Sequence, residues 1–135
     1  EPRSKSELAN AYTLLADLFL RKKEYGQAIE ALEKERNLRD QGFNDLYYFA
    51  PSRMGKVGLF FYNYFNTAIA YESLGDYTKA TEFLEKASNI TTNSFRYNKI
   101  AEEYRKMGME QKAQGEEEKA KNAKNEDPMP KILFE

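Results

Sequence analysis

One side-chain pattern occurs three times in this sequence. Each copy holds an aromatic residue, a second residue three positions later, an alanine directly after it, another aromatic, and finally another alanine. The copies are Tyr12, Leu15, Ala16, Phe19, Ala28; Tyr64, Thr67, Ala68, Tyr71, Ala80; and Tyr97, Ile100, Ala101, Tyr104, Ala113. In every copy the first tyrosine and the last alanine are 16 residues apart. A pattern that recurs with fixed internal spacing indicates stacked copies of one small helical unit.

The composition excludes several classes of function. The chain has 135 residues and a net charge of −1, so its overall charge favours neither nucleic acid nor an anionic membrane as a partner. No apolar run approaches the roughly 20 residues that a membrane span needs. Because the sequence holds no histidine and no cysteine, the usual zinc ligands, thiol nucleophiles and Ser-His-Asp triads are excluded. We therefore expect no catalytic residues, no metal and no cofactor, and we do not expect an enzyme.

Apolar side chains recur at helical spacing through most of the chain. This periodicity predicts six helices, at residues 7–22, about 25–39, 57 to about 74, 77 to about 89, about 95–107 and about 109–125. The last of these carries glutamate and lysine at most of its large positions, which is typical of a solvated terminal helix. The final residues, 128–135, form an apolar tail that we expect to dock back or to bind a neighbour.

These repeats resemble those of the tetratricopeptide repeat family, in which each unit is two antiparallel helices of about 34 residues. The resemblance covers roughly residues 9–125, and the second copy matches best. It implies an all-α fold, a right-handed α-solenoid of about three helical hairpins with an insertion between the first and the second. The implied organisation is a single domain at 1–127, with repeats at about 9–40, 61–93 and 94–125, an insertion at about 41–60, and a C-terminal tail at 128–135.

The three repeats are unequal. Tyr64 follows Tyr12 by 52 residues, whereas Tyr97 follows Tyr64 by 33, and the longer interval contains the insertion. Either the third helix is extended at its start, or residues 43–51 form a loop or a short helix. Glu35 stands where the first repeat should carry a small residue, and Glu117 replaces a large apolar residue of the third. The third repeat therefore resembles a terminal cap, or a repeat whose neighbour is missing.

In the resembling family, the first helix of each repeat lines a concave groove that takes peptides. Carried over by register, the groove residues in this chain are Asn10, Thr13, Leu14 and Asp17; Tyr62, Phe65, Asn66 and Ile69; and Phe95, Asn98, Lys99 and Glu102. An apolar and aromatic centre with polar and basic flanks suits an extended or helical peptide with apolar anchors. One subfamily grips the carboxylate end of heat-shock chaperones. Asn66 and Lys99 fit that clamp, but Asp17 would repel a carboxylate, so we predict no such clamp.

The resemblance implies a non-enzymatic scaffold that binds a peptide segment or a partner domain in this groove. Two alternatives stay open. Since the chain begins at Glu1, we expect a processed product or a piece of something longer, which favours a regulatory or sensory segment of a signalling protein. The apolar tail favours self-assembly instead, with Ile132, Leu133 and Phe134 packing on a neighbouring copy. No signal peptide is visible, which predicts a cytoplasmic location.

Overall fold

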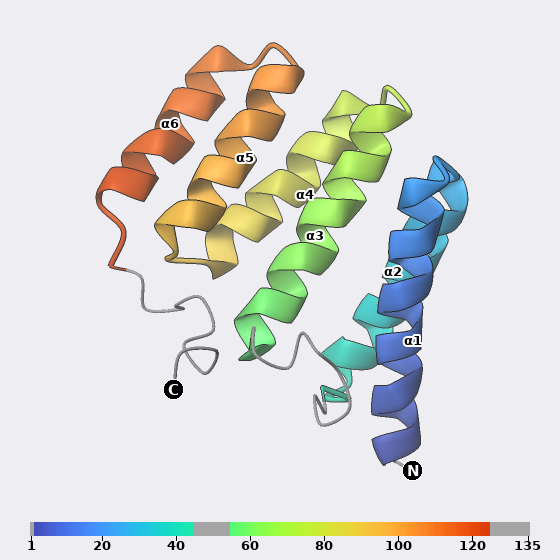
Figure 1. Cartoon of the computed structure of the whole chain (residues 1–135). Coiled ribbons are helices and arrows are strands. Elements are labelled where there is room, and N and C mark those ends of the chain that lie inside the picture. The colour runs from blue at the N-terminus through green and yellow to red at the C-terminus, as the bar shows by residue number, and fades with distance from the viewer. Residues whose placement is uncertain (1, 45–54, 125–135) are drawn as a thin grey trace.

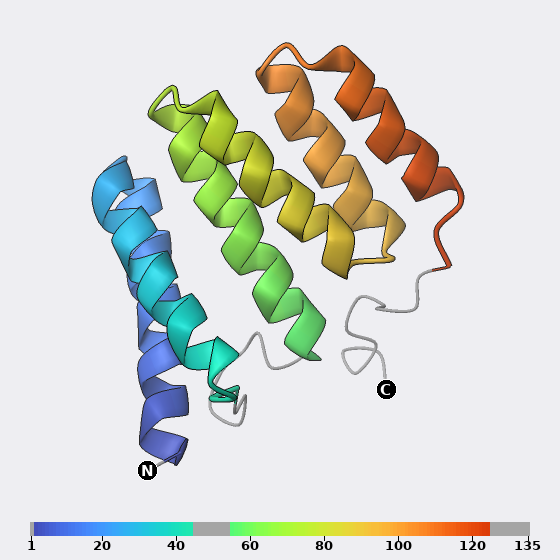
Figure 2. The same cartoon turned by 180° about the vertical axis from the view of Figure 1, so that it is seen from behind.

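The computed structural model describes residues 2–44 and 55–124, and these residues form six helices (Figure 1). The helices are α1 (Pro2–Arg21), α2 (Tyr25–Asp40), α3 (Gly55–Ser73), α4 (Tyr77–Ile90), α5 (Ser94–Lys106) and α6 (Glu110–Lys121). They pair as three antiparallel hairpins, and α2 and α4 each pack onto the first helix of the next hairpin. Figure 1 looks onto α1 and α3, and the reverse view in Figure 2 brings α2 and α4 to the front. In the described ranges, none of the helices has the length and apolar character needed to cross a bilayer.

The predicted all-α array of helical hairpins is confirmed, and three helix ends differ from the prediction. α1 begins at Pro2 rather than at residue 7, because proline suits a first turn whose N–H groups have no helical partner. α3 begins at Gly55, two residues before the predicted start at residue 57. α6 ends at Lys121 rather than near residue 125. Residues 45–54, which make up half of the predicted insertion at about 41–60, lie outside the described residues, as does the predicted tail at 128–135.

All three hairpins close with the same turn. One residue in each turn has a left-handed backbone, and these equivalent residues are Lys23, Gly75 and Gly108, with φ of 62°, 84° and 76°. The next amide donates to a carbonyl five residues earlier, from Glu24 to Phe19 at 2.8 Å, from Asp76 to Tyr71 at 2.9 Å, and from Met109 to Tyr104 at 2.9 Å. This bond closes the end of the first helix in the manner of a Schellman motif. Glycine adopts this backbone without steric cost, so the lysine in the first turn is the exception.

The variant Lys23→Gly is expected to raise the free energy of unfolding by about 1 kcal/mol. An L-residue in the left-handed region costs about 1–2 kcal/mol, and the greater freedom of glycine in the unfolded chain offsets part of that gain. Urea unfolding followed by circular dichroism measures the change. The matched control is Lys22→Gly, because Lys22 precedes Lys23 in the same turn and lacks the positive φ. Equal effects of the two substitutions would contradict this account of the turn.

The helices of each hairpin meet at small side chains. The first helices contribute Ala16, Ala68 and Ala101, and the second helices contribute Ala28, Ala80 and Ala113. All six alanines are buried, so the two backbones of each hairpin approach closely. The remaining apolar core has two parts. A small cluster around Leu32 lies in the first hairpin, and a larger one around Phe61, Leu84 and Ile100 joins the second and third hairpins.

Candidate functional site

A network of buried polar side chains lies at the junction between the first and second hairpins. Glu35 and Arg39 lie one turn apart on α2, with 2% and 0% of their side-chain surface exposed, and Arg39 Nε donates to Glu35 Oε2 at 2.6 Å. From α3, Asn63 Nδ2 donates to Glu35 Oε1 at 2.8 Å and to the carbonyl of Leu32 at 2.9 Å. The Asn63 side-chain oxygen accepts from Arg36 Nη1 at 2.6 Å. Both charges of the Glu35–Arg39 pair are therefore compensated inside the protein, which offsets the cost of removing them from water.

This network takes up two of the residues predicted to line the groove. Arg39 Nη2 donates to Asn10 Oδ1 at 3.1 Å and to Thr13 Oγ1 at 3.0 Å. Asn10 is buried, and the Thr13 hydroxyl donates to the carbonyl of Ala9 at 3.1 Å. Both side chains thus hold α1 against α2. Since the Asn10 side-chain oxygen and the Thr13 hydroxyl are bound to Arg39 within the hairpin, we remove both residues from the set of candidate ligand contacts.

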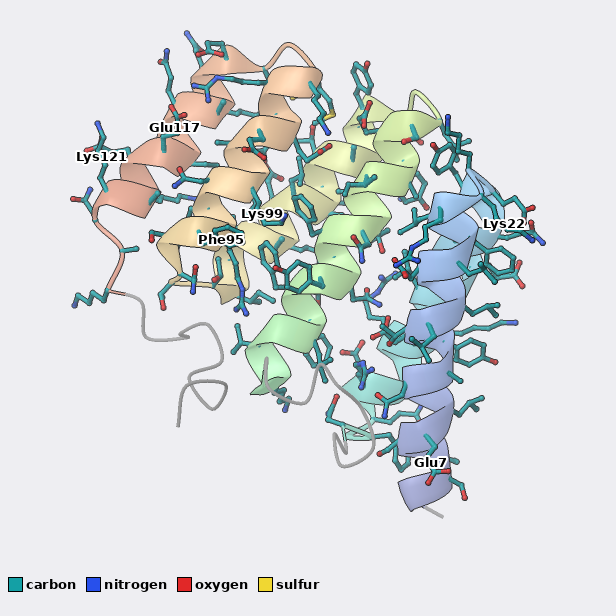
Figure 3. The ribbon with its side chains drawn as sticks, in the orientation of Figure 1. Glu7, Lys22, Phe95, Lys99, Glu117 and Lys121 are labelled. Atoms are coloured by element: carbon teal, nitrogen blue, oxygen red, sulfur yellow. The ribbon has the colours of Figure 1, made fainter. Side chains whose placement is uncertain are left out.

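The side of the molecule formed by α1, α3 and α5, here named the first-helix face, carries an aromatic pair bridged by a lysine. Lys99 Nζ lies 5.5 Å from the ring centre of Phe65 on α3 and 5.5 Å from that of Phe95 on α5. Figure 3 shows Phe95 and Lys99 on the side of α5 that faces the viewer. Phe65 is 6% exposed and belongs to the core, whereas Phe95 is 50% exposed. A cation beside an open ring offers a site for a group that is both apolar and acidic.

A second cation and aromatic contact joins α5 to α3 next to this pair. The guanidinium of Arg96 lies 5.4 Å from the ring centre of Phe61 and 5.8 Å from that of Tyr62. Arg96 is buried, and Tyr62 packs edge-on against Phe61 with ring centres 5.0 Å apart. These contacts set how α5 lies against α3. They thereby fix the positions of Phe95 and Lys99, which neighbour Arg96 on α5.

The six other predicted groove residues are spread along the three first helices. On α3, Asn66 and Ile69 are half-buried. The other four are exposed, with Leu14 and Asp17 on α1 and Asn98 and Glu102 on α5. Asp17 forms an ion pair with Arg21 at 2.9 Å. Asn98 lines a hollow of about 710 Å³ between α5 and α6, together with Glu117 and Lys121. The residues that the structure brings together most closely are therefore Phe65, Phe95 and Lys99.

Sequence reasoning missed the buried arginines. Arg39 and Arg96 are among the largest fully buried side chains of the described residues, although arginine is mostly exposed in proteins. For Arg39 a signal was present in the sequence. Glu35 occupies a position expected to be small, and Arg39 follows it by four residues, the spacing at which opposite charges on a helix pair.

Several charged side chains lie near the turn that joins α5 to α6. Arg105 binds Glu110 at 3.0 Å and also Glu117, and the hydrogen bond from Arg105 holds the pKa of Glu117 below its usual value. Nearby, the hydrogen bond to Glu103 raises the pKa of Lys106. Within residues 2–44 and 55–124, no three carboxylates are grouped so as to hold a metal ion. The arrangement offers charged and aromatic contacts for binding.

Comparison with known protein families adds an independent observation. A family model described as tetratricopeptide repeat matches residues 9–34 and 62–93. The first range covers most of the α1–α2 hairpin, and the second covers most of α3 and all of α4. No curated protein matches the chain.

Proposed function

The chain belongs to the tetratricopeptide repeat family, whose repeats generally mediate protein–protein interactions, and we propose that it is a non-enzymatic scaffold that binds a peptide segment of a partner protein. We place the binding site on the first-helix face, centred on Phe95 and Lys99. The half-exposed Phe95 ring beside the Lys99 ammonium carries this proposal.

The surroundings of Lys99 support a role in binding. Within the part of the chain that the structure describes, its ammonium makes no ion pair, and its contacts are the two phenylalanine rings. By contrast, Lys106 and Lys119 on neighbouring surfaces are each bound to a glutamate. A lysine held between rings and without an acidic partner can receive a carboxylate from a ligand. Its pre-positioned stem lowers the conformational entropy that binding would cost.

These contacts define the chemistry of the partner segment. An aromatic or aliphatic side chain of the peptide would pack on the exposed side of Phe95, and an acidic group next to it would pair with Lys99. Aromatic anchors contribute most of the binding energy in interfaces of this kind. The adjacent charge selects among apolar segments, because electrostatic complementarity gives specificity.

Peptides selected from a random library against the wild-type chain test this proposal by titration calorimetry. We expect them to combine an apolar anchor with an acidic residue, and we expect Phe95→Ala to weaken their binding at least about tenfold. Lys99→Met should weaken binding of the same peptides while preserving the apolar stem. Phe65→Ala is unsuitable, since Phe65 is part of the core.

The matched control is Tyr77→Ala, which removes an exposed aromatic side chain at the start of α4. It should leave peptide affinity unchanged. Selected peptides that bind Phe95→Ala and Lys99→Met as tightly as the wild type would rule out this site, and a loss of affinity in all three variants would indicate a general structural effect instead.

A further inference from the structure

The first hairpin has an apolar face on its open side, here named the N-terminal face. It comprises Leu8, Ala11, Tyr12, Leu15 and Phe19 on α1, with Ala31 on α2. Between α1 and α2 this face has a hollow of about 200 Å³. Leu8 and Leu15 are among the exposed large apolar side chains of the described residues. They lie seven residues apart, so they share one side of α1.

The equivalent positions of the other two hairpins are covered. Thr67 and Ile100 correspond to Leu15 in the repeat register, and they are 1% and 0% exposed, whereas Leu15 is 39% exposed. In each case the second helix of the preceding hairpin supplies the cover. Arg36 of α2 donates to Asn63 on α3 at 2.6 Å and lies 5.0 Å from the ring centre of Phe83.

At the third hairpin the cover comes from α4. Ile100 packs in one apolar cluster with Leu84 and Ala87 of α4. α4 also contacts α6, where Lys119 Nζ donates to Ser88 Oγ at 2.8 Å. Ser88 occupies the register position in its hairpin that Arg36 occupies in the first. The same surface of this chain therefore receives a helix twice, and at the first hairpin none of the described helices covers it.

The two ends of the array differ in polarity. The C-terminal end of the array carries Gln114, Glu117, Glu118 and Lys121 of α6, which line the hollow beside Asn98 of α5. A polar outer face is what a terminal repeat needs in order to remain in contact with water. The N-terminal face lacks that character, so its composition suits an interface.

We propose that the N-terminal face binds the same face of a second copy of this chain around a two-fold axis. An interface of this symmetry uses the same surface of both copies. Homodimer interfaces are also more apolar than those between proteins that associate transiently. Head-to-tail stacking would instead bury charged side chains of α6 against Leu8 and Leu15, which offer them no polar partners. The border of the face is self-complementary. Glu30 and Lys34 pair at 3.3 Å along α2, and a two-fold axis between them sets each Glu30 opposite the Lys34 of the other copy.

Sedimentation velocity on the full chain over a range of concentrations provides the test. We expect a mass of twice 15.7 kDa at high concentration and dissociation on dilution. Leu15→Glu should weaken the dimer at least about 100-fold, because each dimer contains two copies of the introduced charge. Leu74→Glu is the matched control, since Leu74 is also an exposed leucine but lies in the α3–α4 turn. Circular dichroism verifies that both variants remain helical.

Charge reversal tests the symmetry itself. Glu30→Lys and Lys34→Glu should each weaken the homodimer, and an equimolar mixture of the two variants should form a heterodimer. A monomeric wild-type chain, or a dimer that Leu15→Glu leaves intact, would overturn the proposal. So would a dimer that is lost on truncation after Asp127 but unaffected by Leu15→Glu, because that result would place the contact in the C-terminal tail. Peptide binding at Phe95 is measured separately, so failure of one proposal leaves the other standing.

Discussion

Replacement of Glu35 by alanine is expected to lower the free energy of unfolding by about 3–5 kcal/mol. The substitution leaves the guanidinium of Arg39 buried without its carboxylate, and an uncompensated buried charge has a cost of this size. It also removes one of the two acceptors of Asn63 Nδ2, which weakens the contact between α2 and α3. Urea unfolding followed by circular dichroism measures the loss. Wild type and variants are compared at a concentration where sedimentation finds a monomer, because dimerisation would couple stability to concentration.

Glu30→Ala is the matched control for this measurement. Glu30 lies on the same helix as Glu35 and pairs with Lys34 at the same four-residue spacing, but both side chains are more than half exposed. An exposed pair of this kind contributes at most about 1 kcal/mol. Similar losses for Glu30→Ala and Glu35→Ala would show that burial of the Glu35–Arg39 pair does not govern its energetics.

Hydrogen exchange distinguishes how the loss is distributed along the array. Contacts in a repeat protein are confined to neighbouring units, so a weakened junction allows one end to open while the rest stays folded. With Glu35 replaced, amides of α1 and α2 should lose more protection than those of α4 and α5. Uniform loss of protection would indicate that the three hairpins unfold as one unit.

The repeat register made the hairpins predictable from sequence, because the spacing of the tyrosines and alanines repeats the geometry of one helical pair. It also placed residues on a given side of each helix. The register does not predict which side chain of a neighbouring helix contacts those residues. Asn10 and Thr13 do lie on α1 where the register puts them, but Arg39 of α2 extends to both. The identity of such long polar contacts depends on the packing of side chains between helices.

The same limit explains the outcome at Phe65 and Phe95. Both were predicted to line a groove by their positions on first helices, and the structure makes one a core residue and the other a surface residue. Phe65 stacks on Phe61 with ring centres 5.6 Å apart, which removes it from the surface. Phe95 lies in the first turn of α5, the first helix of the last hairpin. Among the described residues, no following hairpin covers it. Asn98 shares the register of Phe65 in the last hairpin and is exposed, so depth within the array decides exposure even at one register position.

Replacement of Phe61 by alanine is the second large effect, with an expected loss of about 3–5 kcal/mol in the free energy of unfolding. Phe61 is fully buried, stacks on Phe65, and receives the guanidinium of Arg96 at 5.4 Å. Its removal leaves a cavity between α3 and α5 and deprives the buried Arg96 of an aromatic contact. The cavity lies in the apolar cluster shared by the second and third hairpins, so hydrogen exchange should locate the loss in α3 to α6.

Phe95→Ala serves as the control for Phe61→Ala, because it removes the same side chain from a half-exposed position on the adjoining helix. We expect it to cost less than about 1 kcal/mol, since little buried surface is lost. Equal losses for the two variants would contradict the assignment of Phe61 to the core and of Phe95 to the surface. A small loss for Phe95→Ala together with weaker peptide binding would separate the role of this residue in recognition from any role in folding.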